Sequence, residues 1–191
     1  MAGLGTLMNV AGILAGGLAG LIFGKFMTQR YQDTLTMACG VSVMFIGIAG
    51  TMEKMMSVAG QSLTSGGTMM MIGSFMIGSL LGEWMNIEHY LEELGRWLKA
   101  KTGSSGDKLF VDGFVTASLT VCIGAMAVVG AIQDGIYGNY SILAAKAVLD
   151  LIIILVMTAS MGKGCLFCAI PVGVFQGFIT FLARLIEPFM T

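Results

Sequence analysis

The chain has 191 residues, of which 56% are hydrophobic and only 11% are charged, and its formal net charge at pH 7 is −1. Soluble domains carry about 25% charged residues, so this composition indicates an integral membrane protein and excludes an ordinary soluble one. The sequence has no basic run of the kind that binds nucleic acid, so no nucleic-acid partner is expected.

Six apolar segments approach the length of about 20 residues that a helix needs to cross the bilayer core. They consume most of the chain, so residues 1–191 are predicted to form a single transmembrane domain. Its fold class is all-α, a polytopic membrane bundle of about six transmembrane helices plus one amphipathic interfacial helix. The predicted spans cover residues 4–26, 34–54, 67–86, 110–133, 141–161 and 164–186.

The first apolar segment is predicted to be a retained span. The first basic residue of the chain, Lys25, comes only after the apolar run 4–24, whereas a cleavable signal peptide begins with basic residues. Glycines recur along it at four-residue spacing, which places them on one helical face that another helix can approach closely. Tight packing is one interpretation of such faces, and sliding of helices during transport is the other. The glycines are Gly12, Gly16, Gly20 and Gly24, and small residues recur similarly in 73–82.

Residues 87–101 differ from the rest of the chain because their apolar and charged side chains separate onto opposite faces of a helix. With Trp84 and Trp97 at headgroup depth, this segment is predicted to be an amphipathic helix in the cytoplasmic interface. His89 falls on the charged face, so it is interpreted as a surface residue.

Basic residues divide unequally between the two sides that six spans create. Seven lie on one side and two on the other, so the positive-inside rule places the first set in the cytoplasm and both termini outside. The seven are Lys25, Arg30, Arg96, Lys99, Lys101, Lys108 and Lys163, and the two are Lys54 and Arg184.

Asp150 lies near the middle of the fifth predicted span, and Lys146 precedes it by one helical turn. A charge at that depth costs roughly 2.5–3.5 kcal/mol on insertion scales, so it needs a partner, a polar cavity or a substrate. In one interpretation the two charges only neutralise each other. In the other, Asp150 binds an ion, a proton or a cationic group, and Lys146 is its switchable partner.

The fourth predicted span ends on Gln133 and Asp134, before Gly135 and Gly138, which are predicted to break the helix. Glu53 ends the second span in a similar way. These endings are either ordinary interfacial caps or parts of a binding site at a helix break, as transporters use.

Two amides, Asn9 and Gln176, lie inside the first and sixth predicted spans. They are candidates to line a polar path through the membrane. A weak internal repeat is also visible, because spans two and three resemble spans four and five at an offset of 80 residues, which aligns Glu53 with Gln133. The repeat is parallel if the predicted topology holds, and chance similarity of glycine-rich segments is an equal competitor.

Motifs of catalysis are missing from the sequence, which has no HExxH, GxSxG or P-loop pattern and no histidine inside a span. The protein is therefore not expected to be an enzyme. Cys165 and Cys168 form a CxxC pair, but the chain offers few further soft ligands, so packing is the first interpretation. No cofactor and no metal site are expected.

The whole chain resembles the DUF554 family of bacterial membrane proteins. The resemblance rests on three stretches, "GTLMNVAGILAGGLAG" at 5–20, "GFVTASLTVCIGAMAVVGAIQDGIYGN" at 113–139 and "AIPVGVFQGFITFLA" at 169–183. It implies a multi-pass protein of the bacterial inner membrane, without an established substrate, that is usually assumed to be a transporter.

Three functions fit these patterns. The first is a secondary transporter of a small solute or ion, coupled to H⁺ or Na⁺, and the others are an ion channel or passive pore and a non-transporting scaffold subunit. Membrane lipid and a second copy of the chain, in a dimer, are the expected partners. The candidate ion- or substrate-binding residues are Asp150, Lys146, Gln133, Asp134, Asn9, Gln176 and Glu53.

Overall fold

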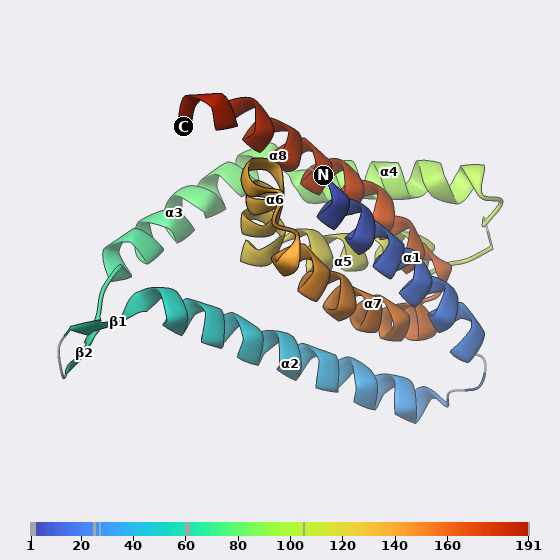
Figure 1. Ribbon diagram of the computed structural model, residues 1–191. Coiled ribbons are helices and arrows are strands. Elements are labelled where there is room, and N and C mark those ends of the chain that lie inside the picture. Colours follow the sequence, from blue (N-terminus) through green and yellow to red (C-terminus); the bar gives the residue numbers. More distant parts are fainter. Residues whose placement is uncertain (1–2, 25, 27, 60–61, 105, 191) are drawn as a thin grey trace.

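The computed structural model describes residues 3–24, 26, 28–59, 62–104 and 106–190, and most of them are helical. Figure 1 shows the order of the elements. Along the described residues these are the helices α1 (Leu4–Phe23) and α2 (Gln29–Met55), the strands β1 (Met56–Ala59) and β2 (Ser62–Ser65), the helices α3 (Thr68–Met85), α4 (Ile87–Lys101), α5 (Phe110–Cys122), α6 (Ala125–Tyr137) and α7 (Ser141–Met161), the 3₁₀ helix η1 (Lys163–Cys168) and the helix α8 (Ala169–Met190).

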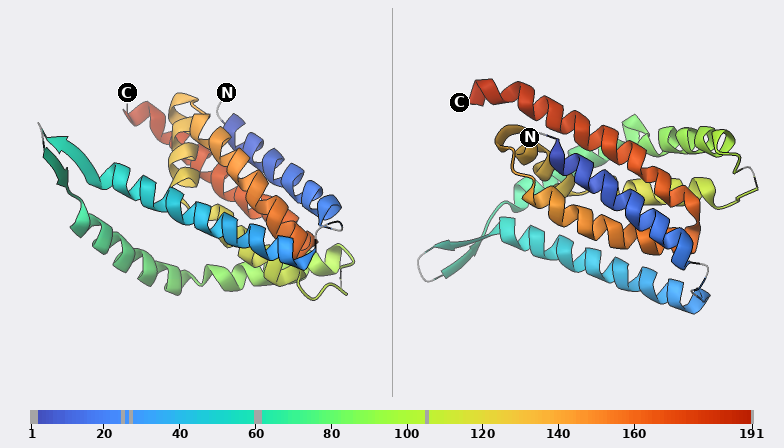
Figure 2. Two further views of the ribbon diagram at one scale, coloured as in Figure 1. Left: turned by 90° about the horizontal axis from the view of Figure 1, so that it is seen from below. Right: turned by 45° about the vertical axis from the view of Figure 1, so that its right-hand side comes forward.

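The centre of the fold is a seam between α1 and α7, which lie side by side (Figures 1 and 2). Each glycine of the α1 stripe lies so close to the α7 backbone that a methyl group there would crowd it, and the expected tight packing is therefore confirmed. The contacts advance together along both helices, so α1 and α7 run parallel. Gly12 meets Ala147, Gly16 meets Leu151, Gly20 meets Leu155 and Gly24 meets Ala159.

The helices α5 and α8 complete the core around this seam. Ile13 of α1 and Ile154 of α7 share one buried cluster with Val121 of α5 and Val172 of α8. Lipid is as apolar as these side chains, so close packing rather than removal from water holds such a core together in a membrane.

The amphipathic helix α4 has the predicted bounds and packs against α5. Leu98 is buried in a cluster with Phe110 and Phe114, while Trp97 stays 56% exposed. The apolar face of α4 is thus divided between α5 and the surroundings of the protein. Its position in the cytoplasmic interface stays a prediction.

The fourth predicted span is broken, which corrects the expectation of one continuous helix over 110–133. The helices α5 and α6 meet at Ile123 and Gly124 with a bend of 59°. The predicted break at Gly135 is wrong, because Gly135 lies within α6 and packs against the Thr180 carbonyl of α8. Gly138 does end α6, with a left-handed φ of 64°. The corresponding part of the weak repeat, α2, is one unbroken helix, so the two halves differ here.

The segment from α2 to α3 forms an arm that stands apart from the core (Figures 1 and 2). At its tip β1 and β2 pair antiparallel, between the predicted spans 34–54 and 67–86. The arm is attached along α2, which contacts α7, whereas no residue of α3 is buried.

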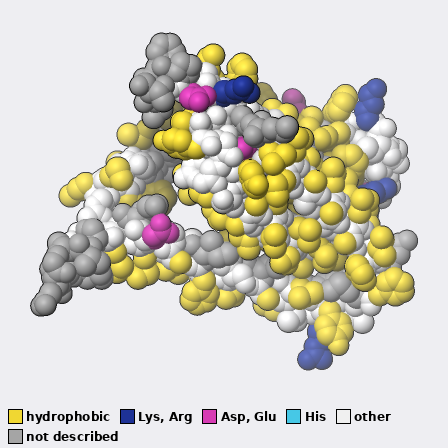
Figure 3. Space-filling view, in the orientation of Figure 1, with side chains coloured by type: hydrophobic (Ala, Val, Ile, Leu, Met, Phe, Trp, Pro, Cys, Tyr) yellow, Lys and Arg dark blue, Asp and Glu magenta, His cyan; other side chains and the backbone are white. Residues whose placement is uncertain are grey.

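Length and apolarity qualify four described helical segments as membrane spans, and the bent pair α5–α6 makes a fifth. α3 is not apolar enough over its length to qualify in the same way, so the count of six spans stays a prediction. In Figure 3 hydrophobic side chains cover most of the visible face of the core, and the few charged ones lie mainly toward its margins. The beginning of α1 and the end of α8 lie at the same end of the core (Figure 1).

Candidate functional site

The two charges in α7 form a buried ion pair. Lys146 Nζ donates to both carboxylate oxygens of Asp150, at 2.8 Å and 2.7 Å. The residues are only 7% and 3% exposed. The contact expected from their one-turn spacing is confirmed, and each charge has its counter-charge inside the protein.

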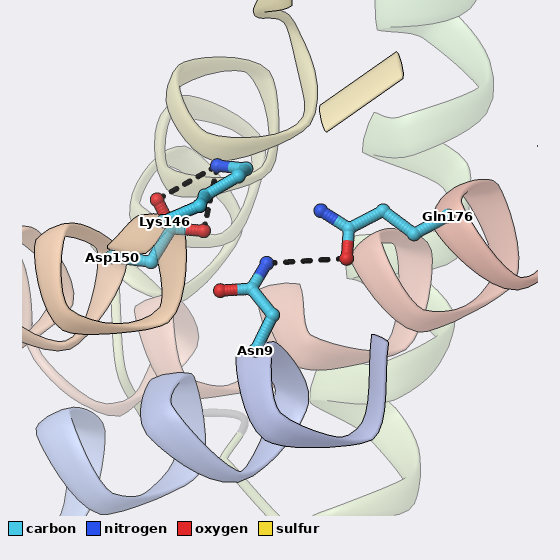
Figure 4. Close-up of polar contacts among 4 residues, drawn as sticks. All are labelled: Asn9, Lys146, Asp150 and Gln176. Atoms are coloured by element: carbon cyan, nitrogen blue, oxygen red, sulfur yellow. Dashed lines mark hydrogen bonds and ion pairs between the residues drawn. The ribbon is translucent and has the colours of Figure 1, made fainter. Parts of the chain in front are cut away.

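Two buried amides lie next to this pair (Figure 4). Asn9 Nδ2 of α1 donates to Gln176 Oε1 of α8 at 3.2 Å, and both side chains are fully buried. Asn9 Oδ1 and Gln176 Nε2 have no hydrogen-bond partner among the described residues. Whichever way the two amides are turned, their single shared bond leaves one group on each residue unused. A buried polar group without a partner costs about 1–3 kcal/mol, so these atoms mark a place where water, an ion or a solute can bind.

The break between α5 and α6 lies beside this polar cluster. Cys122, the last residue of α5, is close enough to interact electrostatically with Lys146 and Asp150. It also packs on the apolar cluster that contains Val172, one turn before Gln176. The span is therefore interrupted close to the four polar side chains but outside their cluster, since Ile123 and Gly124 at the break are exposed.

Asp134 of α6 binds the beginning of α1. Its Oδ2 accepts hydrogen bonds from the backbone N–H groups of Gly3, at 3.0 Å, and Gly5, at 3.1 Å. A carboxylate at the amino end of a helix is stabilised by unsatisfied N–H groups and by the helix dipole. Asp134 is fully buried, and from its place near the end of α6 it caps the start of another helix, α1. Its Oδ1 has no partner among the described residues.

Buried polar groups continue from Asp134 towards the ion pair. The hydroxyl groups of Thr6 on α1 and Thr180 on α8 lie 3.5 Å apart, about one helical turn before Asn9 and Gln176 in space. The order along α1 is therefore the Asp134 contact, the threonine pair and the amide pair. Together they form a polar line from the beginning of α1 to the buried Lys146–Asp150 pair.

Two of the predicted site residues do not join this line. Gln133 is half-buried on α6, where its backbone carbonyl accepts hydrogen bonds from the N–H groups of Gly138 and Asn139. Glu53 is exposed near the end of α2, on the arm. Sequence similarity between the two span endings therefore does not correspond to a shared site.

Sequence reasoning did not assign Thr6, Thr158 or Thr180 to a site. All three are buried, and the Thr158 hydroxyl has no partner among the described residues. Threonines are common in membrane helices and often bond to their own backbone, so composition alone gave no signal for these positions.

The thiols of the CxxC pair belong to the packed core. Cys165 and Cys168 are free and buried, in line with the packing interpretation, and Cys122 packs beside them. In the described part of the chain, no three His, Cys, Asp or Glu side chains gather closely enough to hold a metal ion.

The long apolar helices, the hydrophobic outer face and the buried polar cluster define a multi-pass helical membrane protein. A family model described as "Protein of unknown function (DUF554)" matches residues 4–191. The chain belongs to the DUF554 family.

Two relatives cover nearly the whole chain. The uncharacterised membrane protein YdfK of Bacillus subtilis is 29% identical over 184 residues, which is 96% of this chain and 74% of the relative. The uncharacterised protein YqgA of Escherichia coli is 24% identical over 195 residues, which is 98% of this chain and 77% of the relative. No solved structure matches.

Proposed function

We propose that the protein is a secondary transporter of a small solute or ion, with Asp150 as its coupling site. The observation that carries the proposal is the convergence of four buried polar side chains beside the break in the α5–α6 span. Transporters bind their substrates near the middle of the membrane, where interrupted helices supply unsatisfied backbone groups. Ionisable side chains inside a membrane are expensive and usually functional.

The ion pair supplies a coupling mechanism. A proton or Na⁺ that binds the Asp150 carboxylate competes with the Lys146 ammonium for the same oxygens. Once displaced, a buried ammonium without a counter-charge is destabilised by several kcal/mol. An anionic group of the solute restores that counter-charge, so cation uptake and solute binding stabilise each other. Asn9 and Gln176 then offer their unused amide groups to the solute or to its water.

The polar line gives the coupling ion a route to the pair. It begins at Asp134 and the first residues of α1, and the distribution of basic residues supports a position of that end outside the cell. In this proposal the chain lies in the bacterial cytoplasmic membrane with both termini outside. Side chains of α1 and α8 line the route.

Capacitive current from purified protein in liposomes on a solid-supported membrane tests the proposal. The protein is challenged with pH steps, Na⁺ steps and a panel of small carboxylates, amines and amino acids. We expect a transient current that saturates with solute concentration. In Asp150→Asn the current falls at least tenfold, because the neutral amide neither binds the coupling cation nor releases Lys146 in exchange.

Asp112→Asn is the matched control, because Asp112 is an exposed carboxylate at the start of α5 and takes no part in the cluster. It should retain the wild-type current. A current that keeps growing with solute concentration, without saturation, would indicate a channel instead of a transporter. No current across the panel, with wild-type and variants equally well folded, would favour the scaffold function.

A further inference from the structure

The arm presents an 18-residue apolar helix, α3, that has no extensive packing contact with another described element of its own chain. No residue of α3 is buried, and most of its large apolar side chains are exposed, from 46% at Ile72 to 84% at Met69. On one face of α3, Ser74, Gly78 and Gly82 follow each other at four-residue spacing. Nothing lies within 4 Å of a Cβ atom built at either glycine.

The break in the α5–α6 span exposes backbone that lipid cannot satisfy. Ile123 is 72% exposed, and Gly124 and Ala125 are exposed as well. Among the described hydrogen bonds, none is donated by the backbone N–H of Gly124, Ala125 or Met126. Irregular backbone at membrane depth is tolerated only where protein covers it or where it lines water. In Figure 1 this break lies on the side of the core that faces the arm, but α3 stands clear of it.

The surface area of the single chain is too large for a compact protein of its size. The accessible surface is 12075 Å². A compact monomer of this mass exposes about 8,700 Å². Obligate homodimers bury about 2,000–5,000 Å² in total, half of it on each copy, so an interface in the upper part of that range would remove a large part of the surplus of each chain.

We propose that the protein is a homodimer in which α3 of each copy covers the α5–α6 break of the other. The small-residue face of α3 and the small residues Gly124 and Ala125 let the two backbones approach closely. Ser74 and Ser79 bring hydroxyl groups that satisfy the unpaired backbone at the break, as serine does elsewhere in membrane helices. A two-fold axis makes the contact reciprocal and leaves no copy uncovered.

Glycine substitutions on the two sides of the interface test this arrangement. The mass of the protein in nanodiscs is measured by mass photometry for wild-type and for variants. Gly78→Leu combined with Gly82→Leu, and separately Gly124→Leu, should weaken dimerisation at least tenfold. All three glycines face open space in the single chain, so the variants keep the fold, which circular dichroism checks. Gly73→Leu is the control, because Gly73 lies on the opposite face of α3 and also faces open space; it should remain dimeric.

Photo-crosslinking identifies which copy supplies α3. Phe75, which is 68% exposed on the small-residue face, is replaced by p-benzoylphenylalanine. The labelled protein is then mixed with isotopically heavy protein that lacks the label. We expect crosslinks to heavy peptides that contain residues 119–130. The same label at Phe23, at the far end of α1, should give none. A wild-type monomer, crosslinks confined to the labelled chain, or crosslinks to other regions would each overturn the proposal.

Discussion

At the scale of single residues, Lys146 and Asp150 are tolerated inside the protein because each neutralises the other. Taking one charge out of water costs several kcal/mol, and mutual attraction with two short hydrogen bonds offsets that cost only while both partners are present. The same dependence makes the pair sensitive to anything that occupies Asp150. If the pair had only a structural role, replacing both residues together by apolar ones would leave transport unchanged.

A double-substitution cycle separates these roles. Lys146→Met alone leaves a buried carboxylate without its counter-charge and should lower stability by about 3–5 kcal/mol. Lys146→Met with Asp150→Leu should recover most of that loss, because the apolar pair carries no desolvation cost. Thermal unfolding in detergent measures the stability of all three proteins. If the double variant is as unstable as the single one, mutual neutralisation is not what keeps the charges in α7.

At the scale of elements, the seam between α1 and α7 depends on backbone contact rather than on side chains. The carbonyl oxygens of Leu151 and Leu155 occupy the space that a side chain at Gly16 or Gly20 would need. Asn9 lies on the same helix about two turns before Gly16, so the seam also fixes the distance between α1 and the ion pair. The position of the site therefore depends on a row of glycines that takes no part in its chemistry.

Two alanine substitutions should change stability in opposite directions. Gly16→Ala places a methyl group against the Leu151 carbonyl, so the helices must separate and the melting temperature should fall, with an expected loss of about 1–3 kcal/mol. Gly177→Ala lies in α8 with nothing within 4 Å of its Cβ, so the better helix former should raise stability by up to about 1 kcal/mol. Equal effects of the two substitutions would show that the seam tolerates separation.

At the scale of the whole molecule, the parallel register of α1 and α7 restricts the topology. An odd number of crossings must separate two parallel spans, and α2 with the α5–α6 pair supplies two. Because the bend between α5 and α6 is 59°, less than a right angle, α6 continues in the general direction of α5. A re-entrant loop would instead reverse the direction of the chain. The third crossing then belongs to the chain between Met55 and Phe110, where α3 is the apolar helix. If the pair crosses, this packing gives the same six spans that the apolar segments predicted.

Reporter fusions test this topology. The connection between α4 and α5 should be cytoplasmic, because Arg96, Lys99, Lys101 and Lys108 lie around it. Green fluorescent protein inserted after Gly106 should therefore fluoresce, and alkaline phosphatase at the same place should be inactive. Alkaline phosphatase fused after Thr191 should be active. An active phosphatase at Gly106 would mean that α3 does not cross and that α5–α6 is re-entrant.

The sequence by itself determined the properties that depend on composition and on local spacing. A hydrophobic chain with few charges specifies membrane helices, since only a helix satisfies its own backbone in lipid. Four-residue spacing placed the α1 glycines on one face, and it placed Lys146 within reach of Asp150. These contacts lie within one helix or follow from its periodicity, so they need no knowledge of how the helices are arranged.

Tertiary structure decided which distant residues meet. Asp134 and the beginning of α1 are about 130 residues apart in the chain, and Asn9 and Gln176 are separated by 167 positions, so no local pattern relates them. The position of the α5–α6 break was also not readable, because Gly124 is one glycine among 28. Glycine permits a break wherever it occurs, and the packing of the neighbouring helices selects the one that is used.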